Sequence, residues 1–359
     1  MLDDQSSLRL KLLRFPPIIG VIYIHAYGTV IDYAGGSAGI PVEGLNSLTN
    51  TIRILISEGI ARTAVPLFFL MAGYLFFATF HWSRRTYIIK ISTRLRSLLI
   101  PFLFWNLVVL AVIALAQEIP SIQPYFTGAG KRIADYGAFD YVNAVLGLKG
   151  YPIAYHFWFI RDLMLLVLLA PILAVIVRFV PIPFFVAVYI CWVTNSWPIY
   201  MPAAVGVLFF SAGALCGVND QNLFAFDRFT TLIFLVYVPL LVADVIWYEA
   251  WFNNWLHRTG LIVGVLAVLC STRYILRLPW LRDALITLGS ASFFVYAAHE
   301  PLLGIVRLLA FKVVPLDGAY TMLMLYLFIP VVVMTFLVGC HRLLTKISPQ
   351  TLSLITGGR

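Results

Sequence analysis

Residues 17–31 read PIIGVIYIHAYGTVI and form the first long apolar run of the chain. Such a run predicts a helix that crosses a membrane, where its one histidine, His25, is costly to keep. Arg14 lies eleven residues before His25. If both belong to one helix, eleven steps of about 100° bring their side chains to within about 20° of each other, about 16 Å apart along the axis. Both ionisable groups would then face the same interior.

The remainder of the chain is equally apolar. Of its 359 residues 61% are hydrophobic and 11% charged, and the mean hydropathy is +0.92, which excludes an ordinary soluble protein. Apolar stretches of about 20 residues predict about ten transmembrane helices. The candidate stretches are residues 15–32, 60–80, 97–117, 155–177, 182–195, 200–217, 229–248, 257–272, 284–305 and 321–340. We therefore predict an all-α, polytopic helical bundle, with residues 1–359 as a single transmembrane domain and no separate soluble domain.

Basic residues predict the orientation of this bundle. If the N-terminus is inside, most of the 25 Lys and Arg residues fall at cytoplasmic helix ends. Because cytoplasmic loops retain Lys and Arg, both termini are predicted to be cytoplasmic. The same bias explains the formal net charge of +9 without a nucleic-acid partner. The four cysteines lie in apolar stretches with no paired spacing, so we expect neither a metal site nor a disulfide.

A basic segment lies between the second and third predicted helices. Residues 84–96 carry five cations, among them Lys90, Arg94 and Arg96, and run directly into an apolar stretch. Guanidinium groups match phosphate oxygens in pairs, so the segment is a candidate cradle for an anionic ligand. Membrane topology or contact with anionic lipids explains the same pattern equally well.

His25 is the strongest candidate for chemistry. A neutral imidazole can take a proton from a hydroxyl, and its unperturbed pKa of about 6.5 suits work near neutral pH. The alternative is a structural hydrogen bond between helices. The nearby arginine favours a functional role, because a buried cation must itself be satisfied by an anion.

The arginine, the ten intervening residues and the histidine resemble a motif of the membrane-bound acyltransferase 3 family. Here the motif reads RFPPIIGVIYIH, residues 14–25. Five further stretches resemble the family in order: PLFFLMAGYLF at 66–76, RSLLIPFLFW at 96–105, YHFWFIRDLMLLVLLAPIL at 155–173, MPAAVGVLFFSAGALCG at 201–217 and SFFVYAAHEPLL at 292–303. The resemblance therefore spans almost the whole chain.

This resemblance implies an O-acyltransferase of a bacterial inner membrane. It implies transfer of an acyl group, usually acetyl from cytoplasmic acetyl-CoA, to a hydroxyl of an extracytoplasmic or lipid-linked carbohydrate such as an exopolysaccharide. His25 would be the general base, and the donor phosphates would be held by Arg14, Lys90, Arg94 and Arg96. The matched stretches also supply the expected acceptor-binding residues, which are Tyr74, Trp158, Tyr296 and His299.

Two questions stay open at this point. The Pro16–Pro17 pair is expected to start the first helix, which would leave Arg14 just outside it and weaken the shared face with His25. A proton-coupled secondary transporter is the alternative function, since buried His and Asp residues can form a proton relay. No inverted repeat is visible in the sequence to support it.

Overall fold

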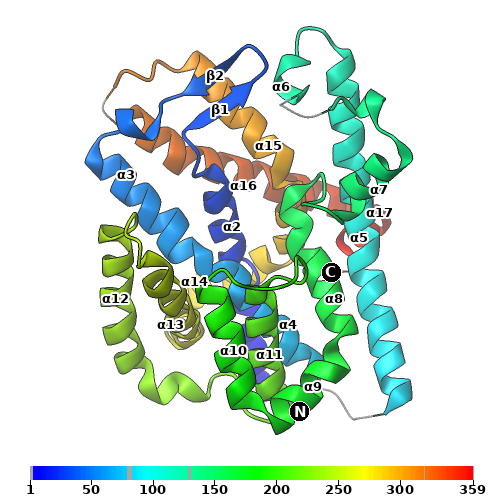
Figure 1. The fold of residues 1–359 in the computed structure, drawn as a ribbon, viewed down its shortest axis with the longest axis vertical. Helices are drawn as coiled ribbons and strands as arrows, with labels where there is room; N and C mark the ends of the chain where they lie inside the picture. Colours follow the sequence, from blue (N-terminus) through cyan, green and yellow to red (C-terminus); the bar gives the residue numbers. More distant parts are fainter. Residues whose placement is uncertain (1–2, 79–82, 128–130, 319, 359) are drawn as a thin grey trace. The chain divides into compact units, whose positions relative to one another are not determined.

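The computed structural model describes residues 3–78, 83–127, 131–318 and 320–358, with the side chain of Arg84 left out (Figure 1). Helices dominate, and the described residues contain a single sheet of two strands. The predicted all-α membrane fold is therefore confirmed. The chain divides into two compact units: residues 1–24, 54–95 and 162–292 form the first, and residues 25–53, 96–161 and 293–359 form the second. Helices α2, α5, α8 and α15 contribute residues to both.

Six helical segments are long and apolar enough to cross a membrane within the described residues. They are Ser47–Phe77, Arg85–Glu118, Ala225–Ile246, Asn253–Ile275, Ser292–Val313 and Thr321–Ile347. Tyr155–Leu168 and Ala170–Phe179 make a seventh candidate, bent by 69°. The other apolar stretches form shorter helices, so the count of about ten stays a prediction.

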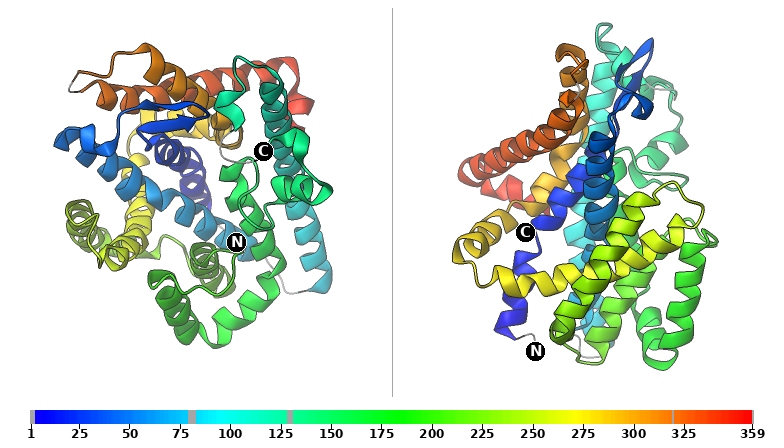
Figure 2. Two further views of the ribbon diagram at one scale, coloured as in Figure 1. Left: turned by 45° about the horizontal axis from the view of Figure 1, so that its top comes forward. Right: turned by 90° about the vertical axis from the view of Figure 1, so that its left-hand side faces the viewer.

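In the part of the first unit that the structure describes, every regular element is a helix. Its elements are α1 (Asp4–Leu12), most of α2 (Pro16–Ala26), η2 (Ile54–Ile60), η3 (Ala61–Thr63), α4 (Ala64–Phe77), the start of α5 (Arg84–Glu118), most of α8 (Trp158–Leu168), α9 (Ala170–Phe179), α10 (Pro181–Val193), α11 (Ala204–Val218), η6 (Ala225–Phe229), α12 (Thr230–Ile246), α13 (Asn253–Ile275) and α14 (Pro279–Gly289). Helices α12 and α13 lie side by side, as both views of Figure 2 show.

Small residues let two helices of this unit approach closely. On α4, a Cβ added to Gly73 would lie 2.0 Å from the carbonyl oxygen of Phe210 on α11. On α11, a Cβ added to Gly213 would lie 2.0 Å from the carbonyl oxygen of Leu70. Backbone-to-backbone packing of this kind is typical of membrane helices, where small residues replace the hydrophobic effect as the basis of association.

The second unit carries the hairpin and the C-terminal helices. Its elements are the end of α2, β1 (Val30–Tyr33), β2 (Gly36–Gly39), η1 (Val42–Gly44), α3 (Ser47–Arg53), most of α5, α6 (Pro124–Thr127), η4 (Ile133–Asp135), α7 (Ala138–Leu146), η5 (Tyr155–Phe157), the start of α8, α15 (Ser292–Val313), α16 (Thr321–Ile347) and α17 (Pro349–Thr356). The strands pair antiparallel, with Val30 opposite Gly39 and Tyr33 opposite Gly36.

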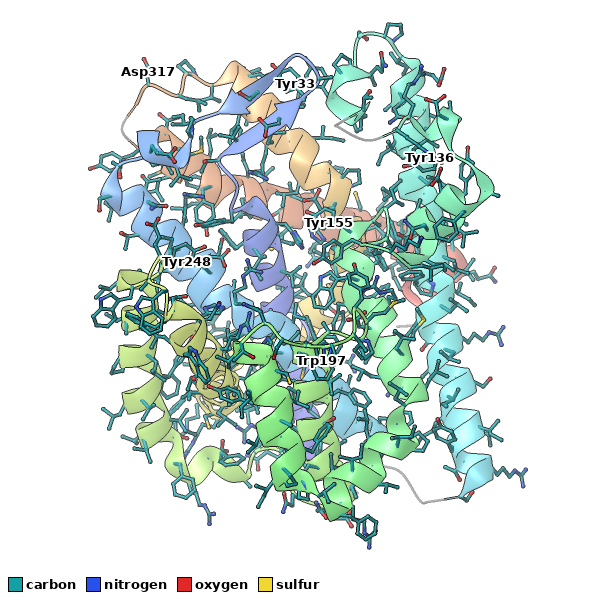
Figure 3. The ribbon with its side chains drawn as sticks, viewed as in Figure 1. Tyr33, Tyr136, Tyr155, Trp197, Tyr248 and Asp317 are labelled. Carbon is teal, nitrogen blue, oxygen red and sulfur yellow. The ribbon has the colours of Figure 1, made fainter. Side chains whose placement is uncertain are left out.

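The hairpin packs on α15 and α16. Ala38 on β2 contacts a buried cluster with Phe311 of α15 and Met322 of α16. Tyr33, labelled in Figure 3, lies beneath the Lys312 ammonium, which is 4.4 Å from the centre of its ring. The first predicted span therefore ends earlier than expected, because the chain turns from helix into strand after α2.

Candidate functional site

His25 lies one residue before the end of α2 and is half-buried. The last carbonyls of a helix lack partners within it. Here two buried arginines donate hydrogen bonds to main-chain carbonyls at the end of the helix and just after it. Arg307 donates from Nη1 to the His25 carbonyl at 3.1 Å and from Nη2 to the Gly28 carbonyl, and Arg53 donates to the Tyr27 carbonyl. Cations at this end of the helix also match its dipole. The two arginines thus fix the backbone that carries His25.

Tyr155 joins His25 to Glu300. Its hydroxyl lies 2.9 Å from His25 Nδ1 and donates a hydrogen bond of 3.1 Å to Glu300 Oε1. Tyr155 is labelled in Figure 3, at the start of η5 ahead of α8. Because a phenol has one proton and gives it to Glu300, we assign Nδ1 of His25 as the donor in the contact with Tyr155. The lone pair of the imidazole then lies on Nε2, the atom that can accept a proton.

Glu300 reaches this position because α15 is broken there. Its backbone has φ −109° and ψ 138°, which is extended rather than helical. Pro301 follows, and a residue before proline is pushed out of the helical region by steric contact with the proline ring. The break turns the carboxylate toward Tyr155. Non-helical backbone at membrane depth is tolerated only where protein or a water-filled cavity surrounds it.

Three imidazoles gather behind Tyr155. The ring centre of His299 lies 5.2 Å from that of His25 and 4.7 Å from that of His156. Nδ1 of His299 lies 2.6 Å from the Tyr296 carbonyl and Nε2 of His156 lies 3.3 Å from the Ala297 carbonyl, so both nitrogens must be donors. Among the described residues, His299 Nε2 and His156 Nδ1 are buried with no hydrogen-bond partner. Each is an acceptor nitrogen.

Two further hydrogen bonds position the loop of Tyr155 and His156. The Tyr296 hydroxyl donates to the His156 carbonyl at 2.6 Å. Asn106, fully buried on α5, donates to the Phe102 carbonyl at 2.8 Å and accepts from the Ala154 amide at 3.1 Å. The loop is therefore tied on one side to α15 and on the other to α5.

The cluster combines an accessible edge with a buried interior. Tyr155 is 40% exposed and His25 and Glu300 are half-buried, whereas His156 and His299 have almost no exposed surface. Within the described residues, no three His, Cys, Asp or Glu side chains are arranged to hold a metal ion. The arrangement can move a proton between a hydroxyl at the accessible edge and the His25 imidazole.

A family model described as an acyltransferase domain matches residues 8–341. The chain belongs to the acyltransferase 3 family. A relative of this acyltransferase is the succinoglycan biosynthesis protein ExoH of Rhizobium meliloti (strain 1021), which is 24% identical over 371 aligned residues. The match covers 100% of this chain and 94% of ExoH. No solved structure matches the chain.

Arg14 lies outside α2. It occupies the turn between α1 and α2, is exposed, and lies beside Gly289, where an added Cβ would be 3.6 Å from the Arg14 Cβ. The prediction that Arg14 and His25 share one helical face was wrong. That geometry requires one continuous helix through both residues, whereas α2 begins only at Pro16. The alternative, with the proline pair starting the helix, is the arrangement observed. A donor-side role for Arg14 stays a prediction.

The other predicted donor-side residues of this acyltransferase lie on α5. Lys90 is half-buried and donates from Nζ to the Phe76 carbonyl at 2.8 Å, whereas Arg94 and Arg96 are exposed. Lys90 and Arg94 belong to the first unit and Arg96 to the second. Their binding of donor phosphates stays a prediction.

Two of the four predicted acceptor residues lie in the His25 cluster. Tyr296 and His299 contact His156, as described above. Trp158 is half-buried at the start of α8, three residues after Tyr155. Tyr74 is buried on α4 of the first unit.

Sequence reasoning missed most of the supporting residues. They are Arg53, Asn106, Tyr155, His156, Glu300 and Arg307. One signal was present for some of them: the stretches that resemble the family contain Tyr155, His156 and the Glu300–Pro301 pair. The two arginines that cap α2 carry no local signal, because their partners are main-chain carbonyls of distant residues.

Proposed function

We propose that this acyltransferase is a membrane O-acyltransferase that modifies a carbohydrate. It moves an acyl group, which we propose to be acetyl, from cytoplasmic acyl-CoA to a hydroxyl of an extracytoplasmic or lipid-linked carbohydrate. Membership of the acyltransferase 3 family supports the reaction class. The name of ExoH, a succinoglycan biosynthesis protein, supports a glycan as the acceptor. Acyl-CoA is the donor substrate, and the proposal includes neither a metal nor a nucleic-acid partner.

The single observation that supports the chemistry is the His25–Tyr155–Glu300 hydrogen-bond chain. In the proposed step, Nε2 of His25 takes the proton of the acceptor hydroxyl as its oxygen attacks the thioester carbonyl. The carbon–sulfur bond breaks, and the departing thiolate takes the proton back from the imidazolium. Glu300, acting through Tyr155, stabilises the positive charge that His25 holds between these two transfers.

The buried histidines act on the acceptor in this proposal. His299 Nε2 has acceptor capacity that nothing in the described residues uses, but it is fully buried. It can therefore receive a hydrogen bond from a second hydroxyl of the sugar only when the side chains that cover it move aside. Tyr296 fixes the loop that carries His156 and Tyr155. Trp158 and Tyr74 are proposed to contact the acceptor as well.

The donor side is proposed to be cytoplasmic. Arg14, Lys90, Arg94 and Arg96 would hold the phosphates of acyl-CoA, because guanidinium and ammonium groups bind phosphate oxygens strongly. The chain would be one multi-pass domain of about ten spans in a bacterial inner membrane, with both termini in the cytoplasm.

The test follows labelled acetyl groups. Membranes containing the protein are supplied with radiolabelled acetyl-CoA, and label is measured in the glycan fraction. His25→Ala should reduce transfer by about 10²- to 10⁴-fold, the usual contribution of a general base. His257→Ala is the matched control, since His257 lies on α13 and pairs with Asp244. Undiminished transfer by His25→Ala would contradict the assigned base.

The same preparation separates the enzyme from a transporter. A secondary transporter would move a solute in response to a proton gradient and would need no CoA thioester. Solute flux without release of CoA thiol would overturn the enzyme assignment.

A further inference from the structure

A second candidate site lies in the first unit and consists of residues that were given no role above. It is a cavity of about 350 Å³. Its lining residues are Gln5, Asp227, Arg228, Arg273, Leu276 and Arg277. Three of the six carry a guanidinium group, and they come from η6, from the end of α13 and from the turn after it.

Asp227, the carboxylate that lines the cavity, is paired with a buried arginine. Arg9, which is 4% exposed, makes a two-pronged contact with Asp227 at 2.5 and 2.9 Å. Arg9 also donates to Thr272 Oγ1 at 2.6 Å and to the Leu269 carbonyl at 3.0 Å. The Asp227 charge is therefore held by Arg9, and the cavity keeps a strong positive charge.

The three cavity arginines contact aromatic rings rather than carboxylates. Arg228 lies over the Phe229 ring, 4.7 Å from its centre, and Arg273 and Arg277 lie 5.6 and 5.9 Å from the centre of the Tyr274 ring. Arg273 also donates to the main-chain carbonyl of Asp227 at 3.2 Å. Across the described part of the chain, none of the three forms an ion pair with a carboxylate. Stacking on aromatic rings orients a guanidinium while leaving its donors available.

The cavity lies at the ends of two candidate spans. Ala225–Ile246 begins three residues before Arg228, and Asn253–Ile275 ends two residues before Arg277. The two helices pack against each other within the first unit. A site at the ends of spanning helices lies near the phosphate groups of the bilayer and the adjoining water.

We propose that Arg228, Arg273 and Arg277 form a binding site for a phosphate-bearing anion. Three oriented guanidinium groups in one cavity match the several oxygens of a phosphate or pyrophosphate, and each can donate in pairs. Two sources carry this chemistry: the headgroup of an anionic phospholipid, and a soluble nucleotide with phosphate groups. The identification of the soluble nucleotide as the acyl-CoA donor rests on the proposed function. The binding of phosphate at this site does not.

The binding test uses the full-length protein in a zwitterionic detergent, titrated with inorganic pyrophosphate. The variant is Arg228→Gln with Arg277→Gln, because both side chains are exposed. The loss of charge-assisted hydrogen bonds should weaken pyrophosphate binding about tenfold or more. The matched control is Arg178→Gln with Arg282→Gln, which removes the same charge from outside the cavity and should bind as the wild type does.

Two arms identify the source. Direct binding of adenosine 3′,5′-bisphosphate to the wild type that is tighter than binding of pyrophosphate, and that is lost in the variant, indicates a soluble nucleotide. Retention of phosphatidylglycerol by the wild type after extraction from phosphatidylcholine–phosphatidylglycerol nanodiscs, measured by native mass spectrometry and lost in the variant, indicates a lipid headgroup.

Equal pyrophosphate affinity of the variant and the wild type overturns the site. An equal loss in the control also overturns it, because the effect would then be one of net charge. If the glutamine variant does not fold, Arg228→Lys with Arg277→Lys decides: it keeps the charge, loses the planar forks, and should bind more weakly than the wild type. Binding is measured without acyl transfer, so a failed proposed function cannot mimic any of these results.

Discussion

The hydroxyl of Tyr155 lies 2.9 Å from Nδ1 of His25 although the two residues are 130 positions apart in the sequence. The same hydroxyl donates to Glu300, 145 positions further on. A carboxylate thus acts on an imidazole through a phenol, much as a carboxylate orients the histidine in a catalytic triad. The contact fixes which nitrogen of His25 carries a proton, and therefore which nitrogen can act as a base.

Removal of the Tyr155 hydroxyl should slow acyl transfer. Tyr155→Phe keeps the ring but breaks both hydrogen bonds, so we expect the turnover rate to fall on the order of tenfold to a hundredfold. The KM for the donor should change little. Tyr151→Phe is the control, because Tyr151 lies four residues away and is 63% exposed. Equal rates for the two variants would contradict the relay.

Glu300→Gln tests the charge at the far end of the chain. Glutamine keeps an oxygen that can accept from Tyr155 but carries no charge to stabilise the imidazolium, so transfer should fall about tenfold. Glu300→Ala removes the acceptor too and should be slower still. The exposed Glu249 supplies a matched control as Glu249→Gln. An alanine variant as active as the glutamine variant would show that the hydrogen bond to Tyr155 is unimportant.

Arg307 is a positioning residue for His25. Arg307→Ala leaves the His25 and Gly28 carbonyls without their donor, which should destabilise the protein by about 1–3 kcal/mol and lower the turnover rate. Arg307→Lys restores the charge but lacks the planar fork whose two nitrogens reach the His25 and Gly28 carbonyls, so it should recover part of the thermal stability and part of the rate. A purely structural role predicts that rate per folded molecule is unchanged in both variants.

Composition and periodicity were sufficient for the fold class. The apolar stretches predicted a helical membrane protein. The sequence resemblance predicted Tyr296 and His299 as acceptor-binding residues, and the structure places both in one cluster with His25. Acceptor binding itself stays a prediction. The position where the first span ends was not predicted. The apolar pattern continues to Ile31, but the chain leaves the helix after Ala26 and forms a hairpin whose Gly35 and Gly39 have φ values of 96° and 114°.

The relay itself could not be predicted from local sequence. Periodicity shows which face of a helix is apolar, but it does not show which distant loop meets that face. Tyr155 looked like one aromatic residue among many, and Glu300 looked like a neighbour of His299. Their roles depend on the break before Pro301 and on the loop held by Asn106, and both are features of tertiary structure.

The close approach of α4 and α11 gives a test of the fold that does not depend on function. A Cβ on residue 213 would lie 2.0 Å from the Leu70 carbonyl oxygen and 2.6 Å from the Tyr74 nitrogen. Both are backbone atoms, so rotation of a side chain cannot relieve the overlap. Gly213→Ala should therefore separate the two helices and destabilise the protein by about 1–3 kcal/mol or more.

The control for this prediction is Gly260→Ala on α13, where an added Cβ meets no atom within 4 Å. Alanine has a higher helix propensity than glycine, so this variant should be as stable as the wild type or slightly more stable. The measurement is the midpoint of thermal unfolding of the purified protein in detergent, followed by tryptophan fluorescence. If Gly213→Ala unfolds at the same temperature as Gly260→Ala, the backbones of α4 and α11 cannot be in contact at this position.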